Sequence, residues 1–405
     1  MIYELKNIIK KHYSVGLMRV LNAVFQIGVL WSVSTKFGSE STGNYALFIS
    51  ILLLSQVIVK FGSDHLIFKD HSGPWDKRDG SEINFLYFSL VNFIIFCPIF
   101  IFIFTKFFNQ YELGDLLVTI ILYNFVLLFS EIYRSKSKYV ISIFSNNVIL
   151  NLSIILLIHS HLVVNEYEII KSIKYLLCFI LICQIIGYKK QPNTNKRFSL
   201  DKTVRFYKRG SRYALTNIMA TMFDFLPIYY IANFISLHEA GIFSILSTIT
   251  QVLPFVGAIV FFKLPVVFSR CVKDSDFNLA RKIYYENLIL VIISSIILST
   301  LIILFQYNLI NFFKINLSGD ILPLYILLAI RLVQGISIGS GTILIMIDKV
   351  NYLNNFQIFS NLFLIACLYN LVEITLVKVL IIVFLSTVLN KVSTIVTSYY
   401  LLRKK

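Results

Sequence analysis

The sequence is built from apolar segments of about 20 residues that recur along the whole chain. A helix needs roughly 20 residues to cross the hydrocarbon core of a bilayer. Hydrophobic residues make up 57% of the chain and charged residues only 14%, whereas a typical soluble domain is about 25% charged. This composition excludes a water-soluble surface and predicts an all-α polytopic membrane protein. The segments expected to form spans are 13–35, 45–60, 83–104, 115–132, 139–158, 169–188, 212–233, 241–262, 284–305, 320–347, 351–371 and 376–401.

Positive charge is distributed unevenly over the connections between these segments. If the N-terminus lies in the cytoplasm, 28 of the 37 Lys and Arg residues fall on inner segments and six on outer ones. An excess of Lys and Arg is typical of cytoplasmic connections. With an even number of spans, both termini are then predicted to be cytoplasmic. The net charge of +16 therefore belongs mostly to the inner face, beside anionic headgroups, and we expect no nucleic-acid partner.

The longest connection separates six predicted spans from six others. We expect an N-terminal six-helix bundle at 1–188, a basic cytoplasmic linker at 189–211 and a C-terminal six-helix bundle at 212–405. The linker is rich in basic and polar residues, so most of it is expected to be solvated. Residues 199–209 are expected to form a basic helix at the membrane interface.

Short motifs repeat at equivalent places in the two predicted bundles. "ESTGNYALFIS" (40–50) opens the second span and "LHEAGIFSILS" (237–247) opens the eighth, with their glycines 198 residues apart. "IFSNN" (143–147) in the fifth span matches "IFSNL" (358–362) in the eleventh. Both bundles start from the cytoplasm, so the repeats are parallel. Such repeats are related by an axis along the membrane normal, with a substrate site between them near the midplane.

Three cations lie inside predicted spans, namely Arg19, Arg331 and Lys391. A charge at the centre of a spanning helix costs roughly 2.5–3.5 kcal/mol on insertion scales, so such residues usually face a bundle interior or a wet cavity. Arg331 is near the middle of its span and is expected to line a cavity. Arg19 and Lys391 are nearer the inner end, where snorkelling to headgroups is an equal alternative.

Polar residues follow these cations at helical spacing. Arg19, Asn22 and Gln26 share one face of the first span, and Arg331 and Gln334 share a face of the tenth. Thr387 precedes Lys391 by one turn. In the seventh span, Thr216 and Asn217 lie two turns before Asp224. We therefore interpret Asn22, Gln26, Thr216, Asn217, Gln334 and Thr387 as candidate cavity-lining residues.

Asp224, in "ATMFDFLPIYY" (220–230), is the only acid placed deep in a predicted span. It has three candidate roles. It is a counter-ion for Arg19 or Arg331, a site for a proton or a sodium ion, or a structural residue bonded to a neighbouring hydroxyl. The sequence does not choose among them.

No motif in the chain indicates enzymatic or metal chemistry. There is no P-loop and no histidine pair of the metal-binding type. The five cysteines are scattered and show no metal-ligand spacing, so we read them as small apolar residues. We expect no catalytic residue, no metal and no cofactor, other than a coupling proton or sodium ion.

The twelve spans, the basic central linker and the paired G-x-Y and G-x-F motifs resemble the polysaccharide-export branch of the multidrug/oligosaccharidyl-lipid/polysaccharide (MOP) superfamily, which is MATE-like in fold. "FGSDHLIFKD" (61–70) and "VLPFVGAIVFFKLPVVFSR" (252–270) are similar to the family's segments after the second span and at the end of the eighth. Within the branch, the chain looks like an O-antigen flippase of the Wzx type.

This resemblance implies two six-helix bundles around a central cavity in the bacterial inner membrane. The implied activity is transfer of an undecaprenyl-diphosphate-linked oligosaccharide from the cytoplasmic to the periplasmic leaflet by alternating access, coupled to an ion gradient. Arg19, Arg331 and Lys391 are then candidates to bind the diphosphate, because guanidinium and ammonium groups suit phosphate oxygens. A polysaccharide polymerase and a chain-length regulator are candidate partners.

Two other functions stay open from the sequence. An O-antigen polymerase has a similar size and composition, but a large external loop is expected of it and the largest loop here is cytoplasmic. A MATE-like drug or cation antiporter would favour acids in its cavity. If the charges near span ends are left aside, the spans of this chain hold three cations and one acid, which favours an anionic substrate.

Overall fold

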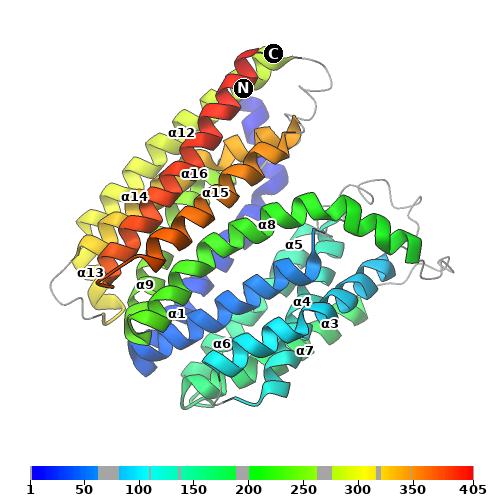
Figure 1. Cartoon of the computed structure of the whole chain (residues 1–405), viewed down its shortest axis with the longest axis vertical. Helices are drawn as coiled ribbons and strands as arrows, with labels where there is room; N and C mark the ends of the chain where they lie inside the picture. The colour runs from blue at the N-terminus through cyan, green and yellow to red at the C-terminus, as the bar shows by residue number, and fades with distance from the viewer. Residues whose placement is uncertain are drawn as a thin grey trace. The chain divides into compact units, whose positions relative to one another are not determined.

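The computed structural model describes residues 2–62, 82–108, 111–135, 138–187, 200–261, 276–315, 321–347 and 349–404. Every element in these ranges is a helix (Figure 1), which confirms the all-helical class for the described part of the chain. In chain order the elements are α1 (Ile2–Lys60), α3 (Glu82–Phe107), α4 (Leu113–Ser135), α5 (Tyr139–Ile143), the π-helix η2 (Phe144–Val148), α6 (Ile149–His159), α7 (Glu166–Gly187), α8 (Leu200–Phe234), α9 (Leu237–Thr250), α10 (Val252–Val260), α12 (Phe277–Leu304), α13 (Gln306–Phe312), α14 (Leu322–Met346), α15 (Val350–Tyr369) and α16 (Leu376–Lys404).

Eight helices of the described part are long and apolar enough to cross a membrane. They are α1, α3, α4, α7, the α9–α10 pair, α12, α14 and α16. The first predicted pair of spans is merged in α1, while α8 and α15 carry polar residues that lower their hydropathy. The number of twelve spans and the cytoplasmic termini therefore stay predictions.

Two breaks in the helices have local causes. Gly38 interrupts α1 with φ 88° and ψ 177°, a conformation that a residue with a Cβ rarely adopts. The predicted eighth span is divided at Gln251 into α9 and α10. Pro254 lacks the N–H that would donate to the Thr250 carbonyl, so the helix loses a hydrogen bond at this point.

The chain divides by packing into two compact units. The N-terminal unit comprises residues 1–37 and 48–221, and the C-terminal unit comprises residues 38–47 and 222–405. Helices α1 and α8 thus contribute residues to both units. The predicted boundaries at 188 and 212 follow the order of the chain rather than its packing, and they stay predictions.

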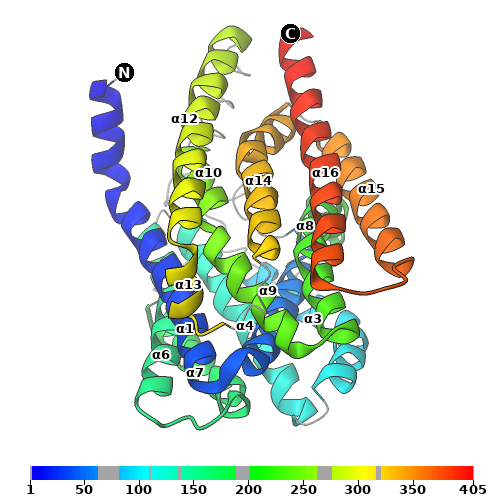
Figure 2. The same ribbon diagram turned by 90° about the vertical axis from the view of Figure 1, so that its left-hand side faces the viewer.

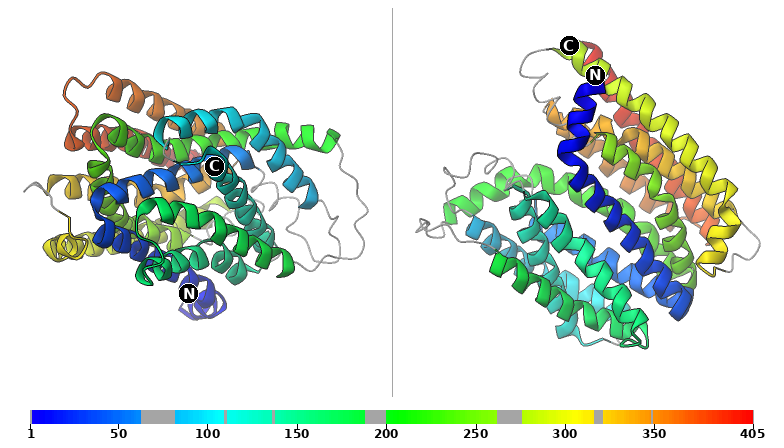
Figure 3. Two further views of the ribbon diagram at one scale, coloured as in Figure 1. Left: turned by 90° about the horizontal axis from the view of Figure 1, so that it is seen from below. Right: turned by 180° about the vertical axis from the view of Figure 1, so that it is seen from behind.

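In the N-terminal unit, α4 packs against α3 and α7, and these helices lie side by side (Figure 3). A buried hydrogen-bond network joins them to the π-helix. Gln184 of α7 donates to the Ser145 hydroxyl and to the Val126 carbonyl, and Tyr133 donates to the Gln184 carbonyl. Side-chain hydrogen bonds between helices hold spans together where hydrophobic burial cannot.

The first turns of α8 replace part of the predicted linker. Residues from Leu200 onward are helical and continue into the predicted seventh span, whereas 188–199 lie outside the described residues. Tyr207 packs its ring against Phe61 and Phe88 and donates to the Asn92 side chain. Residues 200–209, for which the sequence predicts an interfacial helix, are thus helical, and Tyr207 docks this part of α8 on the N-terminal unit.

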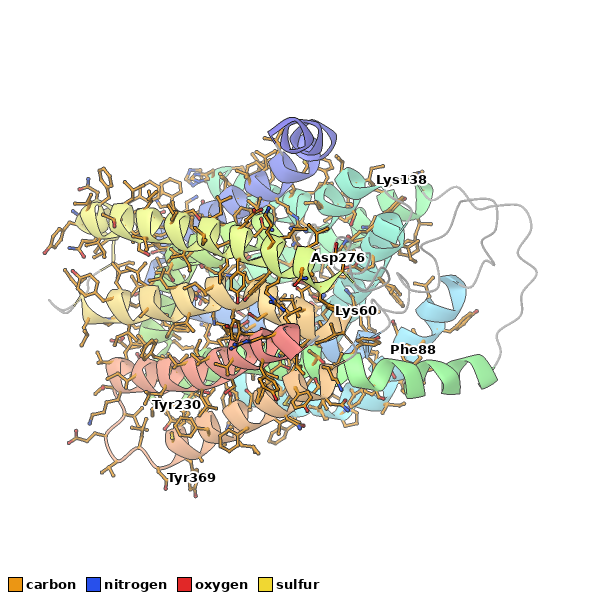
Figure 4. The ribbon with its side chains drawn as sticks, turned by 90° about the horizontal axis from the view of Figure 1, so that it is seen from above. Lys60, Phe88, Lys138, Tyr230, Asp276 and Tyr369 are labelled. Atoms are coloured by element: carbon orange, nitrogen blue, oxygen red, sulfur yellow. The ribbon has the colours of Figure 1, made fainter. Side chains whose placement is uncertain are left out.

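In the C-terminal unit, α14 lies between α16, α12 and α10 (Figures 1 and 2). Gly257 of α10 and Gly335 of α14 meet so closely that a Cβ on Gly257 would lie 2.9 Å from the Gly335 carbonyl oxygen. Small residues at such crossings are typical of membrane helices. At one end of the unit, Tyr230 of α8 donates to the Leu368 carbonyl over 2.7 Å, beside Tyr369 (Figure 4).

Candidate functional site

Three charged side chains come together in the C-terminal unit from three different helices. Asp224 lies on α8, Arg331 on α14 and Lys391 on α16. The Arg331 Nη1 atom is 4.0 Å from the Asp224 Oδ1 atom, and Lys391 also interacts electrostatically with Asp224. Arg331 and Lys391 are therefore two cations near one carboxylate. We call Asp224, Arg331 and Lys391, with the Arg331 partners Ser247 and Gln334, the charged cluster.

The Arg331 guanidinium is held mainly by neutral partners. Its Nη2 atom donates to the Ser247 hydroxyl of α9 over 2.5 Å, and its Nη1 atom donates to the Gln334 side-chain oxygen over 2.6 Å. The distance of 4.0 Å to Asp224 is too long for a hydrogen bond. The Arg331 side chain is only 13% exposed, so it is a positioned and largely buried cation.

Asp224 has the opposite environment. Its side chain is 71% exposed, although its helix lies in the apolar run that the sequence analysis placed in a span. A carboxylate at this depth is costly unless it meets water or cations. Arg331 and Lys391 are the cations near it. Because the carboxylate is exposed, it can exchange these partners for others.

Lys391 is half-buried beside a seam of buried polar groups on α15 and α16. Ser386 of α16 donates to the Ser360 carbonyl of α15 over 2.7 Å, which fixes these two helices against each other. Thr387 is fully buried, and its hydroxyl donates to the Val383 carbonyl of its own helix. Thr387 thus lies in the helix packing, one turn from Lys391.

The N-terminal unit holds Arg19, the third predicted cation. Arg19 on α1 is half-buried and lies near enough to Arg134, in the last turn of α4, to interact with it electrostatically. Arg134 itself pairs with Glu131 one turn earlier, at 3.4 Å between Nη1 and Oε2. Arg19 therefore lies near the Arg134–Glu131 ion pair at the end of α4.

The other polar candidates of the first span divide into two environments. The Asn22 side-chain oxygen accepts a hydrogen bond from the Asn151 amide of α6 over 3.4 Å, and both residues are half-buried. Gln26, one turn further along α1, is exposed. The predicted polar face of α1 therefore contacts a polar residue of α6 at one position.

Thr216 and Asn217 lie in the part of α8 that belongs to the N-terminal unit, and both are half-buried. Asp224, two turns later on the same helix, belongs to the C-terminal unit. The structure thus joins Asp224, Arg331, Lys391 and Gln334 in one cluster. Arg19, Asn22, Gln26, Thr216 and Asn217 belong to the N-terminal unit, and Thr387 lies in the helix packing of α16.

Sequence reasoning missed Ser247, Asn151 and Arg134 as members of these polar groups. Ser247 is one of several hydroxyl residues in an apolar segment, and serine is common in such segments because its hydroxyl can bond to its own helix. Asn151 follows Asn147 by one turn inside an apolar run, which was a readable signal. Arg134 is at a predicted helix end, where a basic residue is ordinary.

Metal-binding geometry is absent from the residues that the structure describes. No group of three or more His, Cys, Asp or Glu side chains in these ranges is placed to hold a metal ion. The four described cysteines, Cys97, Cys178, Cys183 and Cys367, are free thiols.

Comparison of the chain with known proteins identifies its fold through solved structures alone. No protein-family model and no curated protein sequence matches the chain. Among solved structures, that of the MATE multidrug transporter DinF-BH matches with a TM-score of 0.69 and 13% identity, covering 96% of this chain and 94% of that one.

Two further solved structures match over similar lengths. An inward-facing multidrug resistance MATE family transporter of the MOP superfamily has a TM-score of 0.64 at 13% identity, covering 95% of this chain and 96% of that one. A MOP superfamily transporter from Pyrococcus furiosus has a TM-score of 0.63 at 13% identity, covering 97% and 93%. The chain therefore has the fold of the MATE transporters and the apolar helices of a multi-pass membrane protein.

Proposed function

We propose that this chain is a transporter of the MOP type that flips an undecaprenyl-diphosphate-linked oligosaccharide from the cytoplasmic to the periplasmic leaflet of a bacterial inner membrane. The observation that carries the proposal is the charged cluster, in which the two cations Arg331 and Lys391 lie near the single carboxylate of Asp224. The fold supports transport, since its structural relatives are transporters and none of those named above is an enzyme.

The cluster supports an anionic substrate because it carries one more positive than negative charge. A diphosphate offers several charged oxygens, and charge-assisted hydrogen bonds to such oxygens are about twice as strong as neutral ones. Asp224 is exposed and lies beyond hydrogen-bonding distance of Arg331. In our proposal the diphosphate displaces Asp224 from the two cations, while the lipid tail stays in the bilayer.

Asp224 then serves as the counter-ion of the empty transporter. Protonation of Asp224 would remove its competition with the diphosphate, and deprotonation would favour release. A proton or sodium ion at Asp224 and the diphosphate are thus coupled, so this carboxylate is where an ion gradient would act on transport. Export of a surface-polysaccharide unit also implies a polymerase and a chain-length regulator as downstream partners.

The alternative function is a drug or cation antiporter. One observation favours it, because the most accessible charge of the cluster is the 71% exposed carboxylate of Asp224 rather than the 13% exposed guanidinium of Arg331. One relative, the Pyrococcus furiosus protein, is described as having a binding pocket of reverse polarity that suggests a different function. Polarity thus varies within this fold, so the two functions must be separated by experiment.

The first test is a pair of charge removals, Arg331→Gln and Lys391→Met, in cells whose surface-glycan export depends on this chain. Each variant loses a charge-assisted contact of roughly 1.5–3 kcal/mol, so we expect export to fall about 10- to 100-fold. Lys378→Ala is the matched control, because it removes the same charge from an exposed residue paired with Glu373 outside the cluster. Normal surface glycan in both cluster variants would contradict the proposal.

A further inference from the structure

A shallow recess lies between α4 and α7 in the N-terminal unit, where both helices begin. Its lining comes from both helices and from the residues directly before α4. The charged and aromatic residues of the lining are Tyr111, Glu112, Asp115, Tyr167, Lys171 and Lys174. None of them belongs to the charged cluster, whose residues lie in the C-terminal unit. The recess is therefore a candidate site distinct from that cluster.

An ion pair joins the two helices in this recess. The Lys174 Nζ atom of α7 donates to the Asp115 Oδ1 atom of α4 over 2.5 Å, and it lies 4.8 Å from the centre of the Tyr175 ring. The Lys174 and Asp115 side chains are 18% and 30% exposed, so they are held in place and still within reach of a ligand. A carboxylate has about four lone-pair sites and an ammonium has three donors, and their mutual bond uses one of each. The pair therefore offers acceptors and donors side by side.

Two tyrosines form the aromatic part of the recess. The rings of Tyr111 and Tyr167 stack with their centroids 4.7 Å apart and their planes at 24°. Tyr111 is buried and supports Tyr167, which is half-buried. A tyrosine ring combines a flat apolar face with a polar hydroxyl at its end. Part of Tyr167 is thus accessible in the same recess as the Lys174–Asp115 pair.

The charges of the described lining residues cancel. Glu112 and Asp115 supply two carboxylates, and Lys171 and Lys174 supply two ammonium groups. An anion or a cation would meet repelling groups as well as attracting ones, so the recess has no net preference for a charged ligand. A neutral ligand with several hydroxyls can donate to the carboxylates and accept from the ammonium groups, while its C–H face packs on a ring. A sugar combines these two properties.

We propose that this recess is a subsite for one neutral sugar unit of the transported glycan. It lies at the ends of α4 and α7 that adjoin connections 105–114 and 159–168, which the charge distribution predicts to be on the outer side. The sugar is then bound on the side to which the proposed transport delivers it. The inference rests on the proposed function, because that function is what presents a glycan to this chain. A shallow recess suits a single sugar ring rather than a whole oligosaccharide.

Binding of simple sugars to the purified protein in lipid nanodiscs tests the subsite. The probes are the methyl glycosides of glucose, galactose, mannose and N-acetylglucosamine, and their binding is measured by saturation-transfer NMR. A single sugar has few atoms, so we expect at least one glycoside to bind with a dissociation constant of about 1–10 mM. Glucuronic acid and glucosamine are the charged probes, and we expect neither to bind more tightly. The proposal is overturned if no neutral glycoside binds, or if a charged sugar binds at least about 10-fold more tightly than every neutral one.

Two variants locate the binding. Tyr167→Leu removes the ring and keeps an apolar side chain, whereas Asp115→Asn keeps the shape of the carboxylate and removes its charge. We expect each variant to weaken binding of the best glycoside by about 5-fold or more, because each removes one of the two kinds of contact. Phe179→Leu is the matched control, since Phe179 is exposed on the same helix and does not line the recess. Equal affinities for the three variants would show that the sugar does not bind in the recess.

The two proposals fail separately, because the glycoside probes contain no diphosphate. Absence of glycoside binding overturns the sugar subsite and leaves binding of the diphosphate to the charged cluster standing. Glycoside binding that depends on Tyr167 and Asp115, in a protein that does not bind undecaprenyl diphosphate, supports the subsite and contradicts the role of the charged cluster.

Discussion

At the scale of single residues, the buried guanidinium of Arg331 is positioned before any substrate arrives. Ser247 and Gln334 accept its hydrogen bonds, so the cation does not depend on Asp224 for its geometry. A buried charge that keeps neutral partners can exchange its counter-ion without losing its position. This is the arrangement that an anion-binding site needs.

The Ser247→Ala variant tests this positioning role. Removal of the hydroxyl leaves one Arg331 donor without its partner, which costs about 1–3 kcal/mol. We expect weaker binding of undecaprenyl diphosphate, by about 5- to 100-fold, with little change in the amount of folded protein. Ser294→Ala is the control, because the Ser294 hydroxyl is exposed and bonds only carbonyls of its own helix. Equal affinities for the two variants would show that Ser247 does not position Arg331.

The sequence could predict which charges lie inside spans, because a charge in an apolar run is visible without a structure. It left open whether Arg19 or Arg331 would meet Asp224, and it did not predict that Lys391 would lie near this carboxylate. Which cation lies near Asp224 depends on how α8, α14 and α16 are rotated and packed against each other. The sequence of one segment alone does not determine this packing. Ser247 was missed for the same reason, since its role exists only through its contact with Arg331.

At the scale of elements, α8 has two functions along its length. Its first turns dock on the N-terminal unit through Tyr207, whose ring contacts Phe61 and Phe88. Its later turns carry Asp224 in the C-terminal unit. Burial raises the pKa of the Tyr207 hydroxyl, which therefore remains a protonated donor to Asn92 at physiological pH.

Tyr207→Phe tests the docking of α8. The change keeps the ring contacts and removes the hydrogen bond to Asn92, a residue that is fully buried. An acceptor buried without its donor costs roughly 1–3 kcal/mol, so the melting temperature is expected to fall by several degrees. Tyr369→Phe, at an 88% exposed side chain, should leave it unchanged. If the two variants melt alike, the docking contact contributes no stability.

Hydropathy and helical periodicity predicted where helices occur, but they did not predict how helices begin, merge or break. The break at Gln251 depends on Pro254, and the interruption of α1 depends on the positive φ of Gly38. The π-helix η2 falls on the "IFSNN" motif, while its repeat in the second half is an ordinary part of α15. The extra residue of a π-helix turn gives no signal in a pattern based on periodicity.

At the scale of the whole molecule, the charge distribution predicts that the N-terminus, the C-terminus and the basic 189–211 segment share the cytoplasm. Gly43 of α1 and Gly241 of α9, each of which closely approaches the backbone of the other's segment, would then lie toward the periplasm, because Gly43 lies in connection 36–44 and Gly241 directly follows connection 234–240. The fold is that of the MATE transporters.

A labelling experiment checks this orientation. Single cysteines at Glu40, beside the break at Gly38, and at Asp276, the N-cap of α12, are treated with a membrane-impermeant thiol reagent in intact spheroplasts. We expect the Glu40→Cys variant to react and the Asp276→Cys variant to react only after the membrane is permeabilised. The opposite labelling pattern would contradict the predicted orientation. It would show that the connections rich in Lys and Arg lie outside the cytoplasm.

The central claim is that the charged cluster binds an anion. A direct measurement of ligand binding to the purified protein tests this claim best. The purified protein and its Arg331→Gln and Asp224→Asn variants are titrated with undecaprenyl diphosphate and, separately, with a lipophilic cation. We expect the native protein to bind the diphosphate lipid, Arg331→Gln to weaken it about 10- to 100-fold and Asp224→Asn to strengthen it, because a competing counter-ion is removed. Binding of the cation instead, lost in Asp224→Asn and kept in Arg331→Gln, would contradict the account and identify a cation antiporter.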